Sequence, residues 1–326
     1  MGRLYGGIDL GGTKIESVVC DGEGVVLGRE RRPTPVGSAD ALLAALAESL
    51  EAACARAGVR PSELEAAGLG APGPLDAEAG LLLEPPNLGG LRDLPLAEPL
   101  ARRLGVPCFL ENDANAAAVG EFTFGAGRGV RDGVYITLST GIGGGLVLDG
   151  RLYRGAAGTA GEIGHMIVQP DGPLCGCGRR GCWEALASGL ALARQARQAL
   201  AGLAAGPARD WWLERLEGRL EAVTAADVFA AEAQGVPPGP ELVAQEAAWV
   251  GLGMANLIQL LAPRRIVVGG GLSRAGERLL GPARAKALEL AFASATRNLE
   301  IVQAALEAPG AVGAAAVAMR RLRGEG

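Results

Sequence analysis

Apolar residues alternate with small or polar residues in two regions of the chain, and both regions predict strands joined by glycine turns. The first, YGGIDLGGTKIESVVCDGEGVVLGRE at residues 5–30, predicts three strands separated by the GG and DGEG turns. The second, GVYITLSTGIGGGLVLDG at residues 133–150, repeats the order of strand, glycine turn, strand and DG turn. The two hairpins lie about 130 residues apart, which indicates an internal duplication rather than a solenoid repeat.

Leucine and alanine recur at helical spacing in several longer segments. Residues 40–58 predict a helix that ends at Gly58, and residues 241–261 predict another. Residues 185–200 and 224–234 also predict helices, the second of which opens with TAAD in the style of an N-cap. The closing segment AVGAAAVAMRRLR predicts a helix of small residues that can pack closely against a neighbouring element.

Three more apolar runs predict strands that end in glycine, proline or polar residues. AAGLGAPGPLD is a strand that ends in a Gly-Pro loop. GVPCFLEND is a strand followed by a helix, so Asn112 and Asp113 lie at the carboxyl end of a strand, where α/β sheets present ligand groups. In RIVVGGG, the strand at residues 266–268 leads to a helix near Ser273, and the intervening glycines permit either a bound ligand or a left-handed turn.

Composition and charge exclude several classes of protein. The 326 residues suit about two domains, and 49% hydrophobic residues suffice for a core. The net charge of −5 argues against a nucleic-acid partner, which needs a basic face, and against an anionic membrane surface. Asp9 interrupts the first apolar run, so there is no readable signal peptide, and no apolar run has transmembrane length. We therefore expect a soluble, cytoplasmic protein.

The stretch CGCGRRGCWE follows ten residues after His165, the only histidine of the chain. A disulfide between cysteines two residues apart is unfavourable, and no C-x-x-C redox motif is present. The thiols and the imidazole could instead form a tetrahedral Cys3His zinc site, although the C-x-C-x4-C spacing differs from that of zinc fingers, and ordinary thiols remain the alternative. Four protein ligands would make such a zinc structural. The predicted ligands are His165, Cys175, Cys177 and Cys182.

The glycine turns permit two interpretations. Glycines at a hairpin tip let backbone N–H groups surround a phosphate, but they also serve tight turns that need a positive φ. Neither turn is a Walker A loop, because the dipeptide Gly-Lys does not occur in the chain, and neither opens a helix as a dinucleotide-binding loop does. A single histidine also excludes the H-R-D loop of protein kinases and disfavours a Ser-His-Asp hydrolase.

The motifs DLGGTK, END, LSTGIGGG, GEIGH, CGCGRRGCWE and VVGGG, in this order, resemble the ROK family of sugar kinases, most closely its bacterial glucokinases. The resemblance extends from Tyr5 to the final helix. It implies an actin-like ATPase (ribonuclease H-like) fold, with two α/β lobes and an active site in the cleft between them. The implied small lobe comprises residues 1–111 plus 309–326, and the large lobe, with the zinc site, comprises residues 112–308.

The resemblance also implies a reaction, the phosphorylation of glucose at its 6-hydroxyl by ATP and Mg²⁺. Asp113 would be the general base, and Asp9 would help to hold Mg²⁺. Three glycine-rich segments would bind ATP: a phosphate loop of Gly11, Gly12, Thr13 and Lys14; a facing loop of Ser139, Thr140, Gly141, Gly143 and Gly144; and an adenosine border of Gly269, Gly270 and Gly271.

Carboxylates and amides suit a sugar, because each hydroxyl can both donate and accept a hydrogen bond. The family's hydroxyl-binding positions correspond to Asn112, Asp113, Glu162, His165 and Glu184, with Gly73 and Asn87 as weaker candidates. Zinc would hold two segments together so that the two glutamates converge, and His165 would ligate with one nitrogen and hydrogen-bond the sugar with the other.

Several other functions remain alternatives to the phosphorylation of glucose by ATP. N-acetylmannosamine kinase and polyphosphate/ATP glucomannokinase are the related activities, and the donor, ATP or polyphosphate, stays open. A ROK transcriptional repressor is disfavoured, because the first strand begins near Leu4 and leaves no room for a helix-turn-helix. A zinc-stapled binding module would leave the phosphate loops unexplained. We also expect a homo-oligomer, either a dimer or a tetramer.

Overall fold

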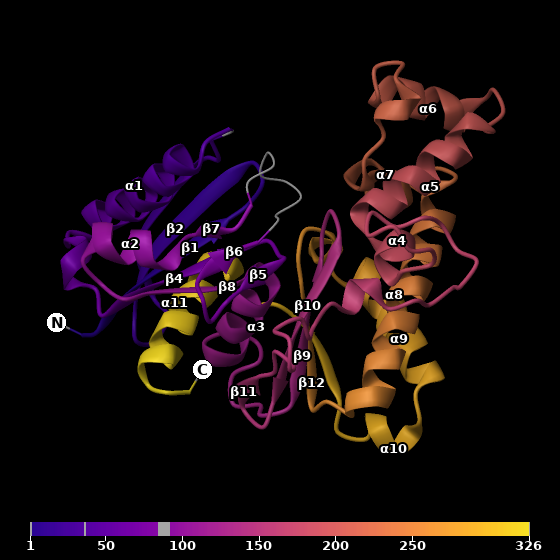
Figure 1. Ribbon diagram of the computed structural model, residues 1–326. Helices are drawn as coiled ribbons and strands as arrows, with labels where there is room; N and C mark the ends of the chain where they lie inside the picture. Colours follow the sequence, from indigo (N-terminus) through magenta and orange to yellow (C-terminus); the bar gives the residue numbers. More distant parts are fainter. Residues whose placement is uncertain (1, 36, 84–91, 326) are drawn as a thin grey trace. The chain divides into compact units, whose positions relative to one another are not determined.

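The computed structural model describes residues 2–35, 37–83 and 92–325, and it divides into two units (Figure 1). The first unit comprises Met1–Tyr135, Gly145–Gly161 and Ala304–Gly326, and the second comprises Ile136–Gly144 and Glu162–Gln303. The lobe boundaries at 111/112 and 308/309 that the family resemblance implies stay a prediction.

The first unit contains a five-stranded sheet with the order β3-β2-β1-β4-β8. The first hairpin runs antiparallel, whereas β1 pairs in parallel with β4, and β4 with β8. The strands are β1 (Leu4–Leu10), β2 (Lys14–Asp21), β3 (Val26–Pro33), β4 (Ala66–Ala71) and β8 (Cys108–Asn112). The three strands predicted for residues 5–30 and the two predicted later strands are therefore confirmed.

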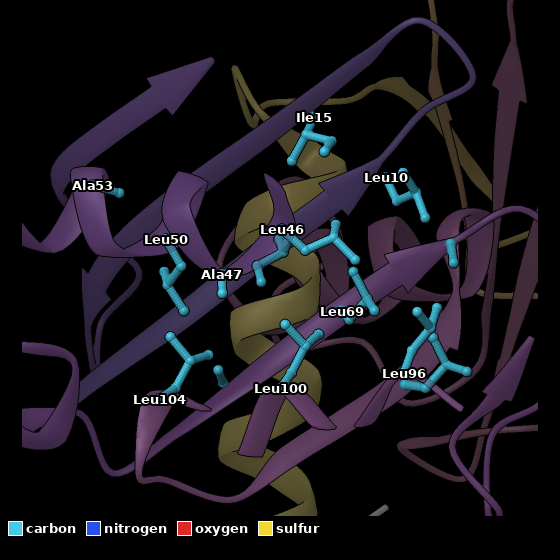
Figure 2. Packing of buried hydrophobic residues seen from close by; sticks show 14 of the residues in the cluster. Leu10, Ile15, Leu46, Ala47, Leu50, Ala53, Leu69, Leu96, Leu100 and Leu104 are labelled. Carbon is cyan, nitrogen blue, oxygen red and sulfur yellow. The ribbon is translucent and has the colours of Figure 1, made fainter. Parts of the chain in front are cut away.

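One face of this sheet is covered by α1 (Ala39–Ala57) and α2 (Ala97–Leu104). Ser38 caps the N-terminus of α1 by accepting a hydrogen bond from the Ala41 amide, and Gly58 ends the helix with a left-handed backbone, as the sequence predicted. Figure 2 shows the buried leucines of this layer. Each such side chain stabilises the fold by about 1.5–3 kcal/mol when it is fully removed from water.

The closing helix α11 (Pro309–Leu322) lies close to the sheet because glycines face it. A Cβ on Gly7 would lie 1.9 Å from the Ala311 carbonyl oxygen, and a Cβ on Gly68 would lie 1.8 Å from that of Ala314. The close packing that the sequence predicted for this helix is confirmed. The same helix packs against α3 (Asp113–Thr123), so it supports the element that begins at Asp113.

A second five-stranded sheet has the order β11-β10-β9-β12-β13. Its strands are β9 (Gly133–Leu138), β10 (Ile142–Leu148), β11 (Arg151–Leu152), β12 (Arg265–Gly269) and β13 (Glu300–Gln303). The second predicted hairpin is confirmed, but its glycine turn is shorter than predicted, since β10 already begins at Ile142. A small third sheet contains β5 (Leu75–Asp76), β6 (Leu81–Leu82) and β7 (Leu94–Pro95).

The helices of the second unit are α4 (Trp183–Ala187), α5 (Gly189–Ala201), α6 (Pro207–Arg215), α7 (Ala225–Ala233), α8 (Gly239–Leu261), α9 (Glu277–Leu290) and α10 (Ala293–Thr296). The predictions for α7 and α8 are confirmed. The single helix predicted for residues 185–200 is wrong: Ser188 has an extended backbone and its side chain caps α5, so the segment forms two helices.

Short 3-10 turns complete the described elements: Pro61–Glu63, Ile163–His165, Leu220–Ala222 and Leu272–Ala275. The last of these turns occupies the position where the sequence predicted a helix near Ser273, and α9 begins only at Glu277. Among the described residues, no helix combines the length and the apolar character that a membrane crossing requires.

Glu246 is a fully buried carboxyl group within α8, and neither of its oxygens has a hydrogen-bond partner. Burial raises the pKa of Glu246 well above its ordinary value. The folded state therefore holds this proton to a higher pH than the unfolded state does. It follows that stability is greatest below the unfolded pKa and falls as the pH rises through the folded pKa.

We expect Glu246→Gln to raise the free energy of unfolding by about 1–3 kcal/mol at about pH 8, and by much less near pH 5. The neutral amide resembles the protonated acid. The variant therefore avoids only the free-energy cost that arises when the buried carboxyl group ionises at high pH. Urea unfolding at the two pH values measures the difference. Glu241→Gln, an exposed change on the same helix, is the control. Equal effects of Glu246→Gln at both pH values would contradict the expectation.

Candidate functional site

The junction between β8 and α3 places two candidate residues side by side. Asn112 caps α3, because its Oδ1 accepts hydrogen bonds from the amides of Ala114 (3.0 Å) and Asn115 (3.1 Å). Asp113, the first residue of the helix, accepts from the Ala114 amide at 2.8 Å. An acidic side chain in the first helical turn is stabilised by the helix dipole. The local sequence thus orients both side chains at the carboxyl end of β8.

Glu111 supports this junction from the buried side of the strand. Its Oε1 accepts from the Asn112 amide and from the Asn115 side-chain amide, both at 3.1 Å. Its Oε2 forms an ion pair with Arg154, at 2.8 Å to Nε and 2.6 Å to Nη2. The carboxylate is almost completely buried, and a guanidinium that contacts it through two nitrogens compensates such a charge well. The sequence did not predict a role for either residue, although a glutamate near the end of a buried strand was a signal.

Asp9 lies on β1, next to the same strand ends, opposite Glu16 on β2 and Gly70 on β4. Burial, together with the carboxylates of Asp113 and Glu16, raises the pKa of Asp9 to about 7, although Lys14 opposes this shift. The structure therefore brings Asp9 and Asp113 close enough to repel each other. Gly310, at the start of α11, leaves the space that Asp9 needs, since a Cβ there would lie 2.5 Å from the carboxyl carbon.

The turn from β1 to β2 contains the first predicted phosphate loop. Gly11 donates its amide to the Lys14 carbonyl at 2.9 Å, and Thr34 fastens the turn by donating its hydroxyl to the Gly11 carbonyl at 2.7 Å. The other two residues of the predicted loop, Gly12 and Thr13, are exposed. The turn is therefore closed at its base and leaves its tip open to a ligand.

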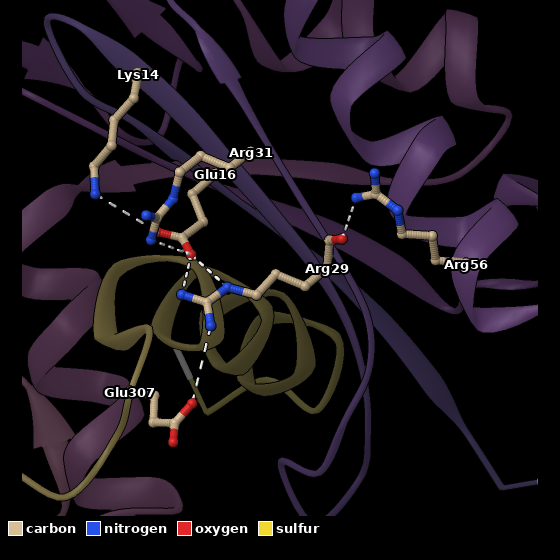
Figure 3. Close-up of polar contacts among 6 residues, drawn as sticks. All are labelled: Lys14, Glu16, Arg29, Arg31, Arg56 and Glu307. Carbon is tan, nitrogen blue, oxygen red and sulfur yellow. Dashed lines mark hydrogen bonds and ion pairs between the residues drawn. The ribbon is translucent and has the colours of Figure 1, made fainter.

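A network of charged side chains lies next to this turn (Figure 3). Lys14 Nζ is 3.8 Å from Glu16 Oε2, and Glu16 also accepts from Arg29 at 2.6 Å and from Arg31 at 3.1 Å. Burial alone would raise the pKa of Glu16, but the hydrogen bonds from Arg29 and Arg31 hold it below its ordinary value. The ionised Glu16 thus fixes three basic residues beside the glycine turn.

The turn from β9 to β10 contains only part of the second predicted loop. Ser139, Thr140 and Gly141 form the turn, and Ser139 donates its amide to the Gly141 carbonyl at 2.9 Å. Gly143 and Gly144, which were predicted in the loop, lie within β10 instead. The placement of these two glycines in the turn is therefore wrong, because the backbone after Gly141 is already extended and paired.

The Ser139–Gly141 turn borders a cavity of about 590 Å³ within the second unit. This volume is typical of a small-molecule site. The lining combines residues of the turn, of α5 and α7, of the segment 222–224 and of the turn after β12, and it includes one cation. The residues are Ser139, Thr140, Gly189, Leu190, Ala193, Arg197, Ala222, Val223, Thr224, Ala225, Ala226, Phe229, Gly271 and Leu272. Of the three glycines predicted to border adenosine, only Gly271 lines it. Gly269 ends β12, and Gly270 has φ +89° and approaches the Leu138 backbone.

Two further sugar candidates, Glu162 and Glu184, lie close in the chain to residues of the cysteine cluster in the second unit. Glu162 precedes the short turn Ile163–His165 and is exposed. Glu184 lies in the first turn of α4, and its Oε2 accepts from the Ile142 amide at 2.9 Å. Gly141 leaves room for this carboxylate, because a Cβ there would lie 2.2 Å from Glu184 Oε2 and the side chain would have to shift. The same turn therefore borders both the cavity and Glu184.

The four predicted zinc ligands gather at one point, with ligand atoms that all lie within 4.8 Å of one another. Cys175 Sγ is 3.7 Å from His165 Nδ1, and Cys177 Sγ is 3.6 Å from Cys182 Sγ. These separations are too long for a disulfide. A tetrahedron with Zn–S bonds of about 2.3 Å has edges of about 3.8 Å, so the donors and their spacing fit zinc. The predicted clustering is confirmed, whereas zinc itself stays a prediction.

Two weaker sugar candidates have different outcomes. Gly73 follows β4, and a Cβ there would lie 3.7 Å from the Asn112 side-chain amide, so Gly73 borders the β8–α3 junction. Asn87 lies outside the described residues. Cys20, Cys54 and Cys108 are free thiols distributed through the first unit, and Cys20 and Cys54 are buried.

The two units of strands and helices, with glycine turns between paired strands and carboxylates at strand ends, define a protein of the actin-like ATPase class, which confirms the predicted fold class. The sequence model of the ROK family matches residues 5–321. The chain therefore belongs to the ROK family.

Comparisons with individual proteins agree with this family. The chain is 42% identical over 279 residues to a glucokinase of Streptomyces coelicolor, which covers 85% of each chain. It is 36% identical over 321 residues to a glucokinase of Thermotoga maritima, which covers 98% of each chain. Among solved structures, a ROK family glucokinase from Streptomyces griseus in complex with glucose and AMPPNP has 38% identity and a TM-score of 0.83, with 97% of this chain and 99% of that chain covered.

Proposed function

We propose that the protein is a glucokinase, which transfers the γ-phosphoryl group of ATP to the 6-hydroxyl of glucose. The observation that carries the proposal is the pair of carboxylates, Asp9 near the end of β1 and Asp113 directly after β8, on the two sides of β4 and beside the Gly11–Lys14 turn. The glucokinase relatives, and the Streptomyces griseus structure with glucose and an ATP analogue, support the same substrates.

Asp113 would accept the proton of the 6-hydroxyl as that oxygen attacks the γ-phosphorus and the bond to the β-γ bridging oxygen breaks. The proton passes to the carboxylate, and ADP leaves with the bridging oxygen. Asn112 would donate its side-chain amide to a sugar hydroxyl, because its Oδ1 is already occupied by the helix cap. The contacts of Glu111 hold the backbone on which both residues sit.

The residues that would hold Mg²⁺ fit that ion. Asp9 offers carboxylate oxygens, which Mg²⁺ prefers, directly or through water, and these oxygens lie near the negative charge of Asp113, which a cation would offset. When bound, Mg²⁺ would neutralise charge on the β- and γ-phosphates. Gly11, Gly12, Thr13 and Lys14 would contact the same phosphates through backbone amides and one ammonium group.

The cavity of the second unit would receive the rest of ATP. Thr140 and Gly141 would contact phosphate oxygens, and the apolar wall formed by Leu190 and Phe229 would pack against the flat adenine. Polyphosphate has no base to fill this space. The cavity therefore supports ATP as the preferred donor.

In the second unit, Glu162, His165 and Glu184 would bind hydroxyl groups of glucose. Nδ1 of His165 is the nitrogen near Cys175, so zinc would bind there and leave Nε2 for a sugar hydroxyl. Zinc would join the segment of residues 162–165 to that of residues 175–184. It would thereby fix the distance between the two glutamates.

A substrate panel tests the proposal directly. Glucose, mannose and N-acetylmannosamine are each offered with ATP and with polyphosphate, and ADP and sugar phosphate are measured separately. We expect glucose with ATP to give the highest kcat/KM. A higher kcat/KM for N-acetylmannosamine, or for polyphosphate as the donor, would replace the proposal by the corresponding related activity. Light scattering of the same samples tests the expected dimer or tetramer.

Thr140→Val should raise the KM for ATP by about 2- to 13-fold, the equivalent of one lost hydrogen bond, and change the KM for glucose less. The hydroxyl would contact a phosphate oxygen, whereas the methyl group that replaces it cannot. Steady-state kinetics with each substrate varied in turn measure both constants in one variant. A larger change in the KM for glucose would assign the turn to the sugar instead.

A further inference from the structure

A small cavity in the first unit lies between the end of α11 and the segment after β11. Its volume is about 10 Å³, which is room for one water molecule or one monatomic ion. The lining consists of three apolar side chains, three guanidinium groups and one carboxylate: Val119, Leu152, Val317, Arg154, Arg320, Arg321 and Glu325. None of these residues belongs to the site described above, apart from the contact of Arg154 with Glu111. We call it the arginine cavity.

Two of the three guanidinium groups around this cavity pair with carboxylates, Arg154 with Glu111 and Arg321 with Glu78, whereas the third is not paired in this way. Arg320 donates to the Gly150 carbonyl at 2.5 Å, and no carboxylate of the described residues forms an ion pair with it. Burial lowers the pKa of Arg320, and although Glu325 opposes this shift, Arg151 and Arg154 lower the pKa further. The guanidinium is therefore held among like charges, in a position that a negative ion would stabilise.

Arg321 provides an independent sign that an acceptor is missing. Its Nη1 pairs with Glu78 Oε1 at 2.7 Å, but its buried Nε has no hydrogen-bond partner. Buried N–H groups are almost always paired, because an unpaired donor costs free energy. A small ligand in the cavity would supply the acceptor. Between the two ligands that fit, the guanidinium of Arg320, which has a carbonyl but no described carboxylate as partner, favours an anion over water.

We propose that the arginine cavity binds one monatomic anion of the chloride class. The size of the cavity excludes sulfate and phosphate. The exposed Glu325 lies at its lining and competes with the ion through its negative charge. The bound ion accepts from the Arg321 Nε and from the Arg320 guanidinium.

The ion would also act on the candidate catalytic carboxylate, an effect that rests on the proposed function. Arg154 lines the cavity and at the same time holds the buried Glu111, which fixes the backbone of residues 112–115. An anion attracts the Arg154 guanidinium and weakens its pairing with Glu111. The start of α3, where Asp113 lies, is then held less firmly, and turnover falls.

Crystals grown with sodium bromide in place of chloride test the site without any measurement of activity. We expect an anomalous bromine peak within hydrogen-bond distance of Arg320 and Arg321. The peak should be absent in Arg320→Gln and present in Arg323→Gln, an exposed arginine of the same segment. Density without an anomalous signal in the wild-type cavity would identify water and overturn the proposal. Displacement of bromide by sulfate would overturn the assignment to a monatomic ion.

Kinetics test the coupling. At constant ionic strength, chloride should lower kcat about two- to fivefold relative to gluconate, and Arg320→Gln should abolish this difference. Glu325→Gln should lower the half-saturating chloride concentration by about two- to fivefold, because a competing surface charge is removed. If bromide is bound in the crystal but kcat is the same in chloride and in gluconate, the proposed coupling to turnover is overturned. If the substrate panel fails for glucose while bromide occupies the cavity, the proposed function falls and the anion site stands.

Discussion

Asp113→Asn should lower kcat by about 10²- to 10⁴-fold, the range that a general base contributes. The amide has nearly the same size as the carboxylate but cannot accept the proton of the sugar hydroxyl. The cap by Asn112 and the ion pair between Glu111 and Arg154 remain in the variant. The affinity for glucose should therefore stay within about tenfold of the wild-type value.

Rapid-quench or coupled kinetics measure kcat, and calorimetric titration measures glucose binding. Asp40→Asn is the matched control, because Asp40 is an exposed acid in the first turn of another helix, α1, outside the site. Its kcat should equal that of the wild type. An Asp113→Asn enzyme that keeps more than about a tenth of the wild-type kcat would remove Asp113 from the role of base.

Cys177→Ser should release the zinc and raise the KM for glucose by about 10- to 100-fold. The wild-type protein should contain close to one zinc per chain by elemental analysis, since the four ligand atoms within 4.8 Å complete one tetrahedral shell. Without the metal, residues 162–165 and 175–184 lose their connection, so Glu162 and Glu184 no longer face the same substrate. Excess Mg²⁺ should not restore activity, because a hard, octahedral cation does not suit three thiolates.

Cys108→Ser makes the same chemical change away from the cluster and should leave the zinc content unchanged. Nucleotide binding should weaken less than glucose binding in Cys177→Ser, because the β12 strand and the turn after it do not depend on the zinc ligands. A wild-type enzyme that is fully active and free of zinc would show that the cysteines are ordinary thiols. The geometry of Glu162 and Glu184 would then need another support.

Much of the fold was readable from the sequence because it depends on neighbouring residues. The alternation of apolar residues identified both hairpins, and the predicted caps at Gly58 and Thr224 act within one helical turn. Where the pattern is ambiguous, prediction failed. An alanine-rich run does not reveal that Ser188 divides it, nor does a glycine repeat reveal that Gly143 already belongs to a strand.

The ordered motifs determined the candidate site to the extent that its chemistry lies in short segments. The zinc ligands, the two glycine turns and Asn112 with Asp113 are each local, so their residue types and spacing were sufficient to propose them. Only the tertiary structure decided which distant groups act on them. Arg154 and Glu111 stand 43 positions apart and meet because β11 and β8 are folded into one unit.

The two cavities were also not predictable from the sequence, because each is lined by residues from distant segments. Arg197, Phe229 and Leu272 line one space although nothing in their separate segments marks them as neighbours, and Arg154 joins Arg320 and Arg321 around another. A local pattern reports which face of an element is apolar, but it carries no information about which other element covers that face. The sequence by itself therefore determined the elements, the family and the reactive groups. The packing of elements distant in the chain decided the shape of the cavity in the second unit, the support of Asp113 and the charges around the arginine cavity.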